Sequence, residues 1–406
     1  MKPFVQLNSE IGVLNTVVLH RPGLELEHLI PPYLEYMLSE DTPHVATAGK
    51  EHDAFAKLLR ENGTEVLYLA DLFLEVIQEE SVRKAFIDEY CEKSPISSKD
   101  LKKTVREYLL NLSSEQLRDV VLRGIMKRDL TGKAAKLLPM AIEEEYPFIT
   151  DPLCGIYFTR DIGVCIGRGM LVSSMSMPFR QRETLLVHYI WQYHPSFRKS
   201  QTPKWYDNSL GYGIEGGDVL VLSDRVLAIG YSERTSLGAV EALAHTLFTQ
   251  GYEKILLFHL PKNRRFMHLD VLFTMVDRNK FLITPALASG QFAIYELSLG
   301  REGQIQAKLQ NQPVKKVLAK ALGLDEVIFI SVGGGDVIYA PREHWNMGSN
   351  VLTIAPGKVV AYDRNDVTNE QLQKNGVEVL TFSGCELSRG RGGPRCMSMP
   401  IHRENL

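Results

Sequence analysis

The chain has 406 residues, 44% of them hydrophobic and 23% charged, and its 46 basic and 49 acidic side chains leave a net charge of −3. This near-neutral balance argues against a nucleic acid as the main partner, because phosphate backbones call for a strongly basic surface. The sequence shows neither a signal-peptide pattern nor a run of about 18 apolar residues, which predicts a cytoplasmic protein without a membrane partner.

Strand and helix patterns alternate near the start of the chain. Residues 16–20 and 65–69 are apolar runs that predict strands, and residues 51–62, closed by Gly63, predict a helix between them. This alternation is typical of an α/β fold.

The strand pattern stops at about residue 72 and returns at about residue 147. The intervening segment is rich in Glu, Lys, Arg and Leu, and its apolar residues recur at helical spacing. We expect an inserted helical bundle here. The predicted organisation is a catalytic α/β domain of residues 1–71 and 147–406, interrupted by a helical domain of residues 72–146.

A weak internal repeat occupies the second part of the chain. Each copy is a hairpin, a loop with an arginine, a helix and a further strand. The hairpins are predicted at residues 164–172, 218–229 and 350–362, the helices from Glu183, at 237–249 and at 368–374, and further strands at 254–258 and 378–382. Units of this kind close around a centre. Acids fall at matching places in the copies, which predicts a ring with carboxylates facing one axial pocket: Asp161, Glu215, Asp218 and Asp336.

Cys396 lies in a loop that has three glycines and a proline just upstream of the thiol. Arg389, Arg391 and Arg395 flank it, and positive charge stabilises the nucleophilic thiolate. The pattern indicates a catalytic cysteine, although by residue type alone a small inert hydrophobic residue is the commoner interpretation.

The cysteines as a group do not suggest a structural role. There are five, an odd number, and none are closely spaced, so neither a disulfide framework nor a zinc knuckle is predicted. Cys385, Cys396 and His402 lack the two-to-four-residue spacing of metal ligands, and we predict no metal site.

Three further residues are ambiguous when taken singly. Asp161 and Glu215 are also typical of surface turns, and His268 is also typical of a satisfied core histidine. Together with Cys396 on neighbouring units of one ring, they would supply a nucleophile, an acid/base and an anionic cradle.

Nine motifs, in order along the whole chain, resemble those of the arginine deiminase family within the guanidino-group modifying enzymes. They are Leu19-His20-Arg21-Pro22-Gly23, Glu51-His52-Asp53-Ala54-Phe55, Phe158-Thr159-Arg160-Asp161, Glu215-Gly216-Gly217-Asp218, Ser232-Glu233-Arg234-Thr235, Met267-His268-Leu269-Asp270, Gly333-Gly334-Gly335-Asp336, Trp345-Asn346 and the Cys396 loop. The resemblance implies a five-bladed pseudo-symmetric α/β propeller (pentein) with an inserted helical bundle. It also implies hydrolysis of free L-arginine to L-citrulline and ammonia without a metal or organic cofactor.

The resemblance assigns roles around the guanidinium. Asp161 and Asp270 would grip it, because carboxylates match its paired N–H donors. Cys396 would attack the central carbon and form an S-alkylthiouronium intermediate. His268 would act as general acid and then as general base, oriented by Glu215.

At the amino-acid end, the resemblance places Arg180, Arg234, Arg391 and Gly393 as substrate-binding residues. This chain departs from the family pattern at Gly155, where an asparagine would contact the substrate. Arg395 stands where one branch of the family has a histidine and another has an arginine, and Met347 stands where an aspartate is common.

Other functions remain open at this point. A related guanidine hydrolase with altered specificity, such as a modified-arginine deiminase or an arginine dihydrolase, is one alternative. A catalytically silent arginine-binding protein is another, less favoured because all five catalytic positions hold competent residues. The resemblance further implies a homo-oligomer, a dimer or tetramer, and the glycines near Cys396 suggest a mobile lid.

Overall fold

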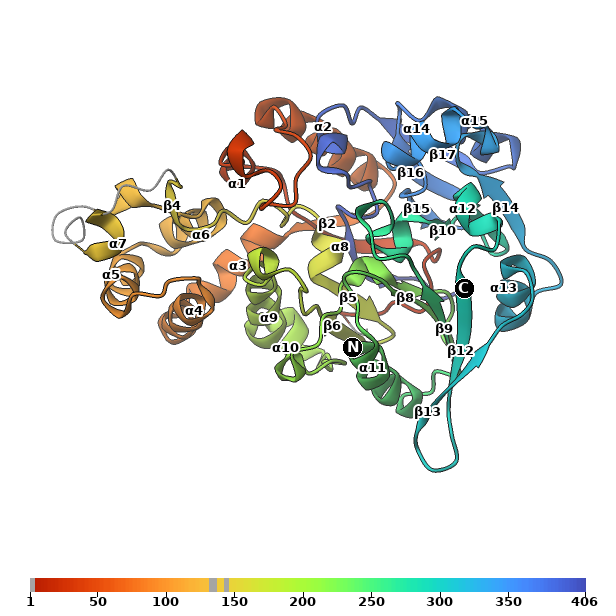
Figure 1. Ribbon diagram of the computed structural model, residues 1–406, viewed down its shortest axis with the longest axis horizontal. Coiled ribbons are helices and arrows are strands. Elements are labelled where there is room, and N and C mark those ends of the chain that lie inside the picture. The colour runs from red at the N-terminus through yellow and green to blue at the C-terminus, as the bar shows by residue number, and fades with distance from the viewer. Residues whose placement is uncertain (1–3, 131–136, 142–145) are drawn as a thin grey trace.

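The computed structural model describes residues 4–130, 137–141 and 146–406 and shows an α/β fold built from small mixed sheets (Figure 1). The first and last strands share one sheet: β18 (Met399–Arg403) is antiparallel to β1 (Leu14–Leu19), and β1 is parallel to β2 (Glu65–Tyr68). Between β1 and β2 come the short helix α1 (Leu24–Glu27) and the long helix α2 (Val45–Glu61). The strand–helix–strand pattern predicted for residues 16–69 is therefore confirmed.

The three predicted hairpins are present, and each is followed by its predicted helix. The hairpins are β5 (Gly163–Ile166) with β6 (Gly169–Val172), β7 (Val219–Val221) with β8 (Val226–Tyr231), and β15 (Leu352–Ala355) with β16 (Lys358–Tyr362). The helices are α9 (Glu183–Tyr193), α11 (Leu237–Thr249) and α15 (Asp366–Lys374).

The strand after the helix differs among the copies. In the second and third copies, β9 (Lys254–His259) and β17 (Glu378–Phe382) pair in parallel with β8 and β16. In the first copy, the short helix α10 (Pro195–Lys199) intervenes, and a single parallel bridge between Met170 and Lys204 takes the place of the strand.

A further unit of the same order, which the sequence did not reveal, follows the second copy. It consists of β10 (Phe273–Met275), antiparallel β11 (Lys280–Ile283), helix α13 (Val314–Leu322) and β14 (Ile328–Ser331), which is parallel to β11. β12 (Ala293–Leu299) and β13 (Ile305–Leu309) instead join β9 and extend that sheet to five strands. The short helices α12 (Pro285–Ala288) and α14 (Tyr339–Trp345) complete this region.

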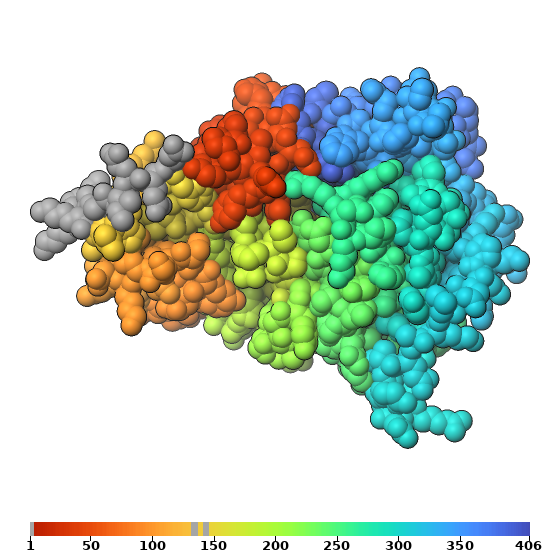
Figure 2. Space-filling model, in the orientation of Figure 1, coloured from red at the N-terminus to blue at the C-terminus, as the bar shows by residue number. Residues whose placement is uncertain are grey.

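Helices dominate the segment predicted as an insertion, and they project to one side of the strands (Figures 1 and 2). They are α3 (Leu69–Ile77), α4 (Glu80–Lys93), α5 (Lys99–Leu110), α6 (Ser114–Arg123) and α7 (Leu138–Ala141). The expected absence of strands is wrong at β3 (Ile125–Met126), which pairs with β4 (Phe148–Thr150). The parts of this prediction at residues 131–136 and 142–145 lie outside the described residues.

The core connects these helices to the sheets. Buried apolar side chains of α3 to α6 belong to the same cluster as those of β5, β6 and α9. A second cluster joins β1, α2 and β7 to β10, β11 and β15. Among the helices of the described ranges, none is both long and apolar enough to cross a membrane.

Candidate active site

A narrow pocket lies at the residues that the sequence singled out. Its cavity volume is about 50 Å³, and its lining includes Asp161, Arg180, Arg234, His268, Arg391 and Cys396. Residues 37–39 and 390–392 also form part of the lining. A cavity of this volume holds roughly three or four water molecules. A larger ligand therefore requires movement of the segments that line it.

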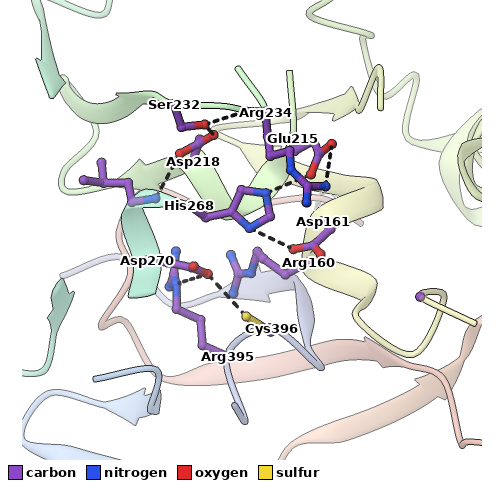
Figure 3. A network of polar contacts seen from close by, with 12 residues as sticks. Arg160, Asp161, Glu215, Asp218, Ser232, Arg234, His268, Asp270, Arg395 and Cys396 are labelled. Atoms are coloured by element: carbon purple, nitrogen blue, oxygen red, sulfur yellow. Dashed lines mark hydrogen bonds and ion pairs between the residues drawn. The ribbon is translucent and has the colours of Figure 1, made fainter. Parts of the chain in front are cut away.

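The five residues predicted to be catalytic converge here from distant parts of the chain (Figure 3). Asp161 lies on the short helix α8 (Thr159–Ile162), and Glu215 precedes a 3-10 turn at Gly216–Asp218. His268 and Asp270 flank the start of another 3-10 turn at Leu269–Val271, and Cys396 lies just before β18. All five side chains are buried.

Cys396 is fixed by its backbone. Its N–H donates to Asn350 Oδ1 at 2.9 Å, and its Sγ lies 3.9 Å from Asp270 Oδ2. The side chain is 5% exposed and lines the pocket. The thiol is therefore held at one place while its sulfur still faces the cavity.

The thiol is not ionised by its flanking arginines, and that expectation is wrong. Burial, followed by the nearby carboxylates of Asp270 and Asp161, raises the pKa of Cys396 well above its ordinary value. Of the three arginines, only Arg395 acts in the expected direction. The empty site thus favours the neutral thiol.

The other two flanking arginines are engaged elsewhere. Arg389 forms ion pairs with Asp41 and Glu386 and its side chain is 43% exposed. Arg391 stacks on the ring of Trp345, with its guanidinium carbon 3.8 Å from the ring centroid.

His268 lies between two carboxylates. Its Nε2 is 2.8 Å from Glu215 Oε2, and its Nδ1 is 3.7 Å from Asp161 Oδ1. Burial lowers the pKa of His268, but Asp161, Glu215 and Asp218 outweigh burial and raise it to about 10. The imidazole is therefore a charged acid at neutral pH.

Glu215 is held as an anion. Burial opposes its ionisation, but the hydrogen bond from His268 and nearby positive charges lower its pKa to about 2. Its Oε1 also accepts from the Ser176 N–H at 3.2 Å and the Ser176 hydroxyl at 3.3 Å. These contacts fix the carboxylate that orients the imidazole.

The remainder of the Glu-Gly-Gly-Asp motif supports His268 from behind. Asp218 accepts from the Ser232 hydroxyl at 2.6 Å and from the Leu269 N–H at 2.9 Å. A Cβ on Gly217 would lie only 2.6 Å from His268 Nδ1, so this close approach requires glycine. Asp218 is buried and, like Glu215, does not line the pocket, contrary to the expectation from the repeat.

Asp161 and Asp270 each keep one oxygen free of hydrogen bonds to the described residues. Asp161 Oδ2 accepts from Arg180 Nη1 at 2.8 Å, while its Oδ1 has no donor. Asp270 Oδ2 lies 3.3 Å from Arg395 Nε, and its Oδ1 has no donor. Burial raises the pKa of Asp270. Two buried acceptors beside a thiol suit a planar cation that carries several N–H donors.

The three arginines predicted for the far end of a substrate are all at the pocket, but they differ in their partners. Arg180 donates to Asp161, to Glu183 and to the Gly155 carbonyl. Arg234 Nη1 lies 4.0 Å from Glu215 Oε1, and its Nε has no acceptor among the described residues. Arg391 has φ +60° and lies 3.6 Å from Glu40 Oε1.

Gly155 makes room for a buried ion pair. Arg180 Nε donates to Glu183 Oε2 at 2.9 Å, and Arg180 Nη2 donates to the Gly155 carbonyl at 3.0 Å. A Cβ on Gly155 would lie 2.6 Å from Arg180 Nε and 2.7 Å from Glu183 Oε1. The pair of Arg180 and Glu183 therefore occupies the space that a side chain at position 155 would need.

Sequence reasoning missed Asn350. Its Oδ1 accepts from the Cys396 N–H, and its Nδ2 donates to the Asp270 carbonyl at 3.2 Å, so it connects two of the predicted residues. Asn350 lies two residues before β15, and no motif marks it. Gly393 accepts from the Met397 N–H at 3.1 Å and so closes the turn that carries Cys396.

The prediction for Asp336 is also corrected. Asp336 does not face the pocket: it is exposed and accepts from the backbone N–H groups of Ile338 and Tyr339 at the start of α14. Met347 is buried with φ +62°, a conformation that aspartate tolerates better than methionine. No three His, Cys, Asp or Glu side chains in the part of the chain that the structure describes are grouped as a metal site.

The fold is shared with enzymes that act on guanidino compounds. The dimethylarginine dimethylaminohydrolase structure with S-methyl-L-thiocitrulline is 13% identical, with a TM-score of 0.53 over 95% of this chain and 99% of that one. SxtG, an amidinotransferase from Microseira wollei, is 13% identical, with a TM-score of 0.56 over 99% of this chain and 98% of that one. The α/β fold with mixed sheets is thus the pentein fold of these structural neighbours.

Sequence similarity narrows this class. The arginine deiminase family matches residues 35–403. The arginine deiminase of Bacillus cereus is 44% identical over 410 residues, which are 100% of both chains, and that of Staphylococcus aureus is 43% identical over 407 residues, which are 99% of both. The chain therefore belongs to the arginine deiminase family, and it is a hydrolase that acts on C–N bonds of amidino groups.

Proposed function

We propose that this chain hydrolyses the guanidinium of free L-arginine to L-citrulline and ammonia, with Cys396 as the nucleophile. The observation that carries the proposal is the buried thiol beside two carboxylates with free oxygens, next to a charged imidazole. Only a cationic, multiply hydrogen-bonding electrophile satisfies all of these groups together.

The substrate cation would complete the site. Its N–H groups would donate to Asp161 Oδ1 and Asp270 Oδ1, the two oxygens without donors. These are the same carboxylates that raise the pKa of Cys396. Because the guanidinium neutralises them, substrate binding lowers that pKa, and the thiol loses its proton to solvent.

The first half-reaction forms a covalent intermediate. The Cys396 thiolate attacks the central carbon, and an S–C bond forms. His268, charged at neutral pH, donates its proton to the departing nitrogen as the C–N bond breaks. Ammonia leaves, and an S-alkylthiouronium cation remains on the sulfur.

The second half-reaction uses the same imidazole. His268, now neutral, takes a proton from the attacking water, and the C–S bond breaks to release the thiolate. The second proton of this water passes to solvent, where the ammonia released earlier takes it up. Arginine and water thus yield citrulline and ammonium. Glu215 holds His268 in place through both steps and favours its charged form.

We also propose that the fold is a five-bladed propeller interrupted by a helical insertion at residues 72–146. Four units of an antiparallel pair with a parallel third strand support this proposal: β18-β1-β2, β7-β8-β9, β10-β11-β14 and β15-β16-β17. The β5-β6 hairpin with its bridge to Lys204 would be the fifth. An experimental structure in which these units do not surround one axis would contradict it.

A guanidine hydrolase with altered specificity is the second candidate. It is favoured by the pairing of Arg180 with Asp161 and Glu183, which leaves this arginine without free charge for a carboxylate. A modified-arginine deiminase and an arginine dihydrolase both belong to this alternative. The family resemblance also supports a homo-oligomer, and the mass from light scattering would test that.

The test is product analysis with the purified full chain and L-arginine. The proposal expects one citrulline per ammonia. Ornithine with two ammonias would establish a dihydrolase, and turnover of a modified arginine alone would establish altered specificity. No turnover of any guanidine would indicate a silent binding protein.

The nucleophile is tested by a matched pair of variants. Cys396→Ala should lose ammonia release to background, whereas Cys385→Ala, at the exposed cysteine, should retain it. Normal ammonia release by Cys396→Ala would rule out the mechanism.

A further inference from the structure

Arg160 holds the segment that carries Cys396, although it does not line the pocket. Its side chain is fully buried. Its backbone N–H donates to the Cys396 carbonyl at 3.0 Å, and its Nε donates to the Ser398 carbonyl, also at 3.0 Å. One residue thus fixes the chain at the nucleophile and two positions beyond it.

Three buried guanidiniums lie behind the thiol, and their partners differ. Arg395 pairs with Glu10 and lies 3.3 Å from Asp270 Oδ2. Arg403 donates to two backbone carbonyls, each at 2.7 Å. Both terminal nitrogens of Arg160 lack an acceptor among the described residues. Neither Arg160 nor Arg403 forms an ion pair with a described residue, and Arg160 is the member of this cluster whose two terminal nitrogens also lack a carbonyl acceptor.

The charges of this cluster do not balance. Arg160 and Arg395 interact with both Glu10 and Asp270, and Arg403 interacts with Glu10, so three positive charges share two carboxylates and one positive charge is uncompensated. A buried charge without a partner is strongly destabilising. Burial, followed by repulsion from Arg395, lowers the pKa of Arg160 to about 10, while attraction by Glu10, Asp270 and Cys396 opposes this shift.

We propose that Arg160 is a positioning residue that supplies the counter-charge against which the Cys396 thiolate forms. Figure 3 shows its guanidinium on the same side of the network as Cys396 and Asp270. Ionisation converts S–H to S⁻ and releases one proton to bulk water, and no other bond changes. The inference deepens the proposed function, since it concerns the same nucleophile.

The charged groups around Cys396 act in both directions. They come from α8, from the turn at Leu269–Val271 and its preceding residue, from the N-terminal segment and from the cysteine's own loop: Arg160, Asp161, His268, Asp270, Glu10 and Arg395. The carboxylates of Asp161 and Asp270 raise the pKa of Cys396 and so disfavour the thiolate. Arg160 and Arg395 both limit this effect, and their charges act on the thiol without it once a substrate cation neutralises the two carboxylates.

The experiment measures thiol ionisation without arginine, so it stands even if arginine is not the substrate. The full chain, with the exposed Cys385 changed to serine, is alkylated with uncharged iodoacetamide across a pH series. A protein that also carries Cys396→Ser gives the background from the other cysteines. The midpoint of the pH profile reports the pKa of the Cys396 thiol.

Arg160→Met removes the charge and keeps an apolar side chain of similar length. We expect its midpoint to rise by about one pH unit, which is about a tenfold loss of alkylation rate below the midpoint. The matched control is Arg403→Met, which removes a charge that already has carbonyl partners, and its midpoint should move by less than about 0.3 unit. An unmoved midpoint in folded Arg160→Met, or an equal shift in both variants, would overturn the proposal.

Arg160→Lys decides the question if Arg160→Met does not fold. It keeps the charge but loses the guanidinium hydrogen bond to Ser398, so its midpoint should remain within about 0.5 unit of the parent. A rise of the midpoint by a full unit in Arg160→Lys would show that hydrogen-bond geometry, and not charge, sets the pKa of the thiol. That result would overturn the proposal.

Discussion

The two ends of the pocket differ in how their charged side chains are paired. At the guanidinium end, Asp161 and Asp270 each retain a free oxygen, and His268 is held in its charged form. At the other end, Arg180 and Arg391 already have carboxylate or aromatic partners. The guanidinium end, which is the chemical end, therefore already offers acceptors to a cation. At the other end, the recognition end, the arginines must give up their present partners before they can bind a carboxylate.

Asp270→Asn should have the largest effect at the chemical end. The asparagine cannot hold the guanidinium as an anion, so kcat/KM should fall by roughly a thousandfold. Because Asp270 also raises the pKa of the thiol, iodoacetamide should alkylate Cys396 faster in the same variant. Steady-state kinetics and alkylation rates check the two effects. A fall in both rates would show that Asp270 does not raise the pKa of the Cys396 thiol.

Glu215→Gln should weaken the acid and change the pH dependence. Without that carboxylate the pKa of His268 falls from about 10, so the alkaline limit of kcat should move to lower pH. We expect kcat near neutral pH to fall by about a hundredfold. An unchanged alkaline limit would assign it to a group other than His268.

The same pair sets a pH window for stability. Glu215, with its pKa lowered from 4.5 to about 2, contributes stability that is present above 4.5 and is lost as the pH falls toward 2. His268, with its pKa raised from 6.5 to about 10, contributes stability that is present below 6.5 and is lost as the pH rises toward 10. The alkaline decline of Tm should therefore be flatter in His268→Gln than in the parent.

Gly155→Ala should act at the recognition end. The new Cβ would lie 2.6 Å from Arg180 Nε and displace this guanidinium from the pocket that it lines, so KM for L-arginine should rise about tenfold while kcat stays within about twofold. The ratio of kcat/KM for arginine to that for a guanidine without an α-carboxylate should fall. A change in kcat alone would show that Gly155 serves the chemical end.

Arg389→Ala should have the smallest effect. Its ion pair with Asp41 is exposed on both sides, and such pairs contribute at most about 1 kcal/mol to the free energy of unfolding. Urea unfolding should show a loss within that limit, and kcat should be unchanged. A large loss of activity would place Arg389 at the pocket after all.

Local patterns were sufficient for much of the fold. The hairpins at β5–β6, β7–β8 and β15–β16 have tight turns and apolar runs, and α11 matches its predicted bounds of residues 237–249. The unit of β10, β11 and β14 was missed because β12 and β13 intervene and pair with a different sheet. No local signal distinguishes those two partners.

The sequence by itself determined which residue types meet at the site and in what order. Cys396, His268, Glu215, Asp161 and Asp270 were named from motifs, and the structure places them together. Only the tertiary structure decided how their charges are balanced. Arg395 pairs with Glu10 across 385 positions, and two carboxylates reverse the expected ionisation of Cys396. Ionisation depends on distances and burial at the site, which spacing along the chain does not contain.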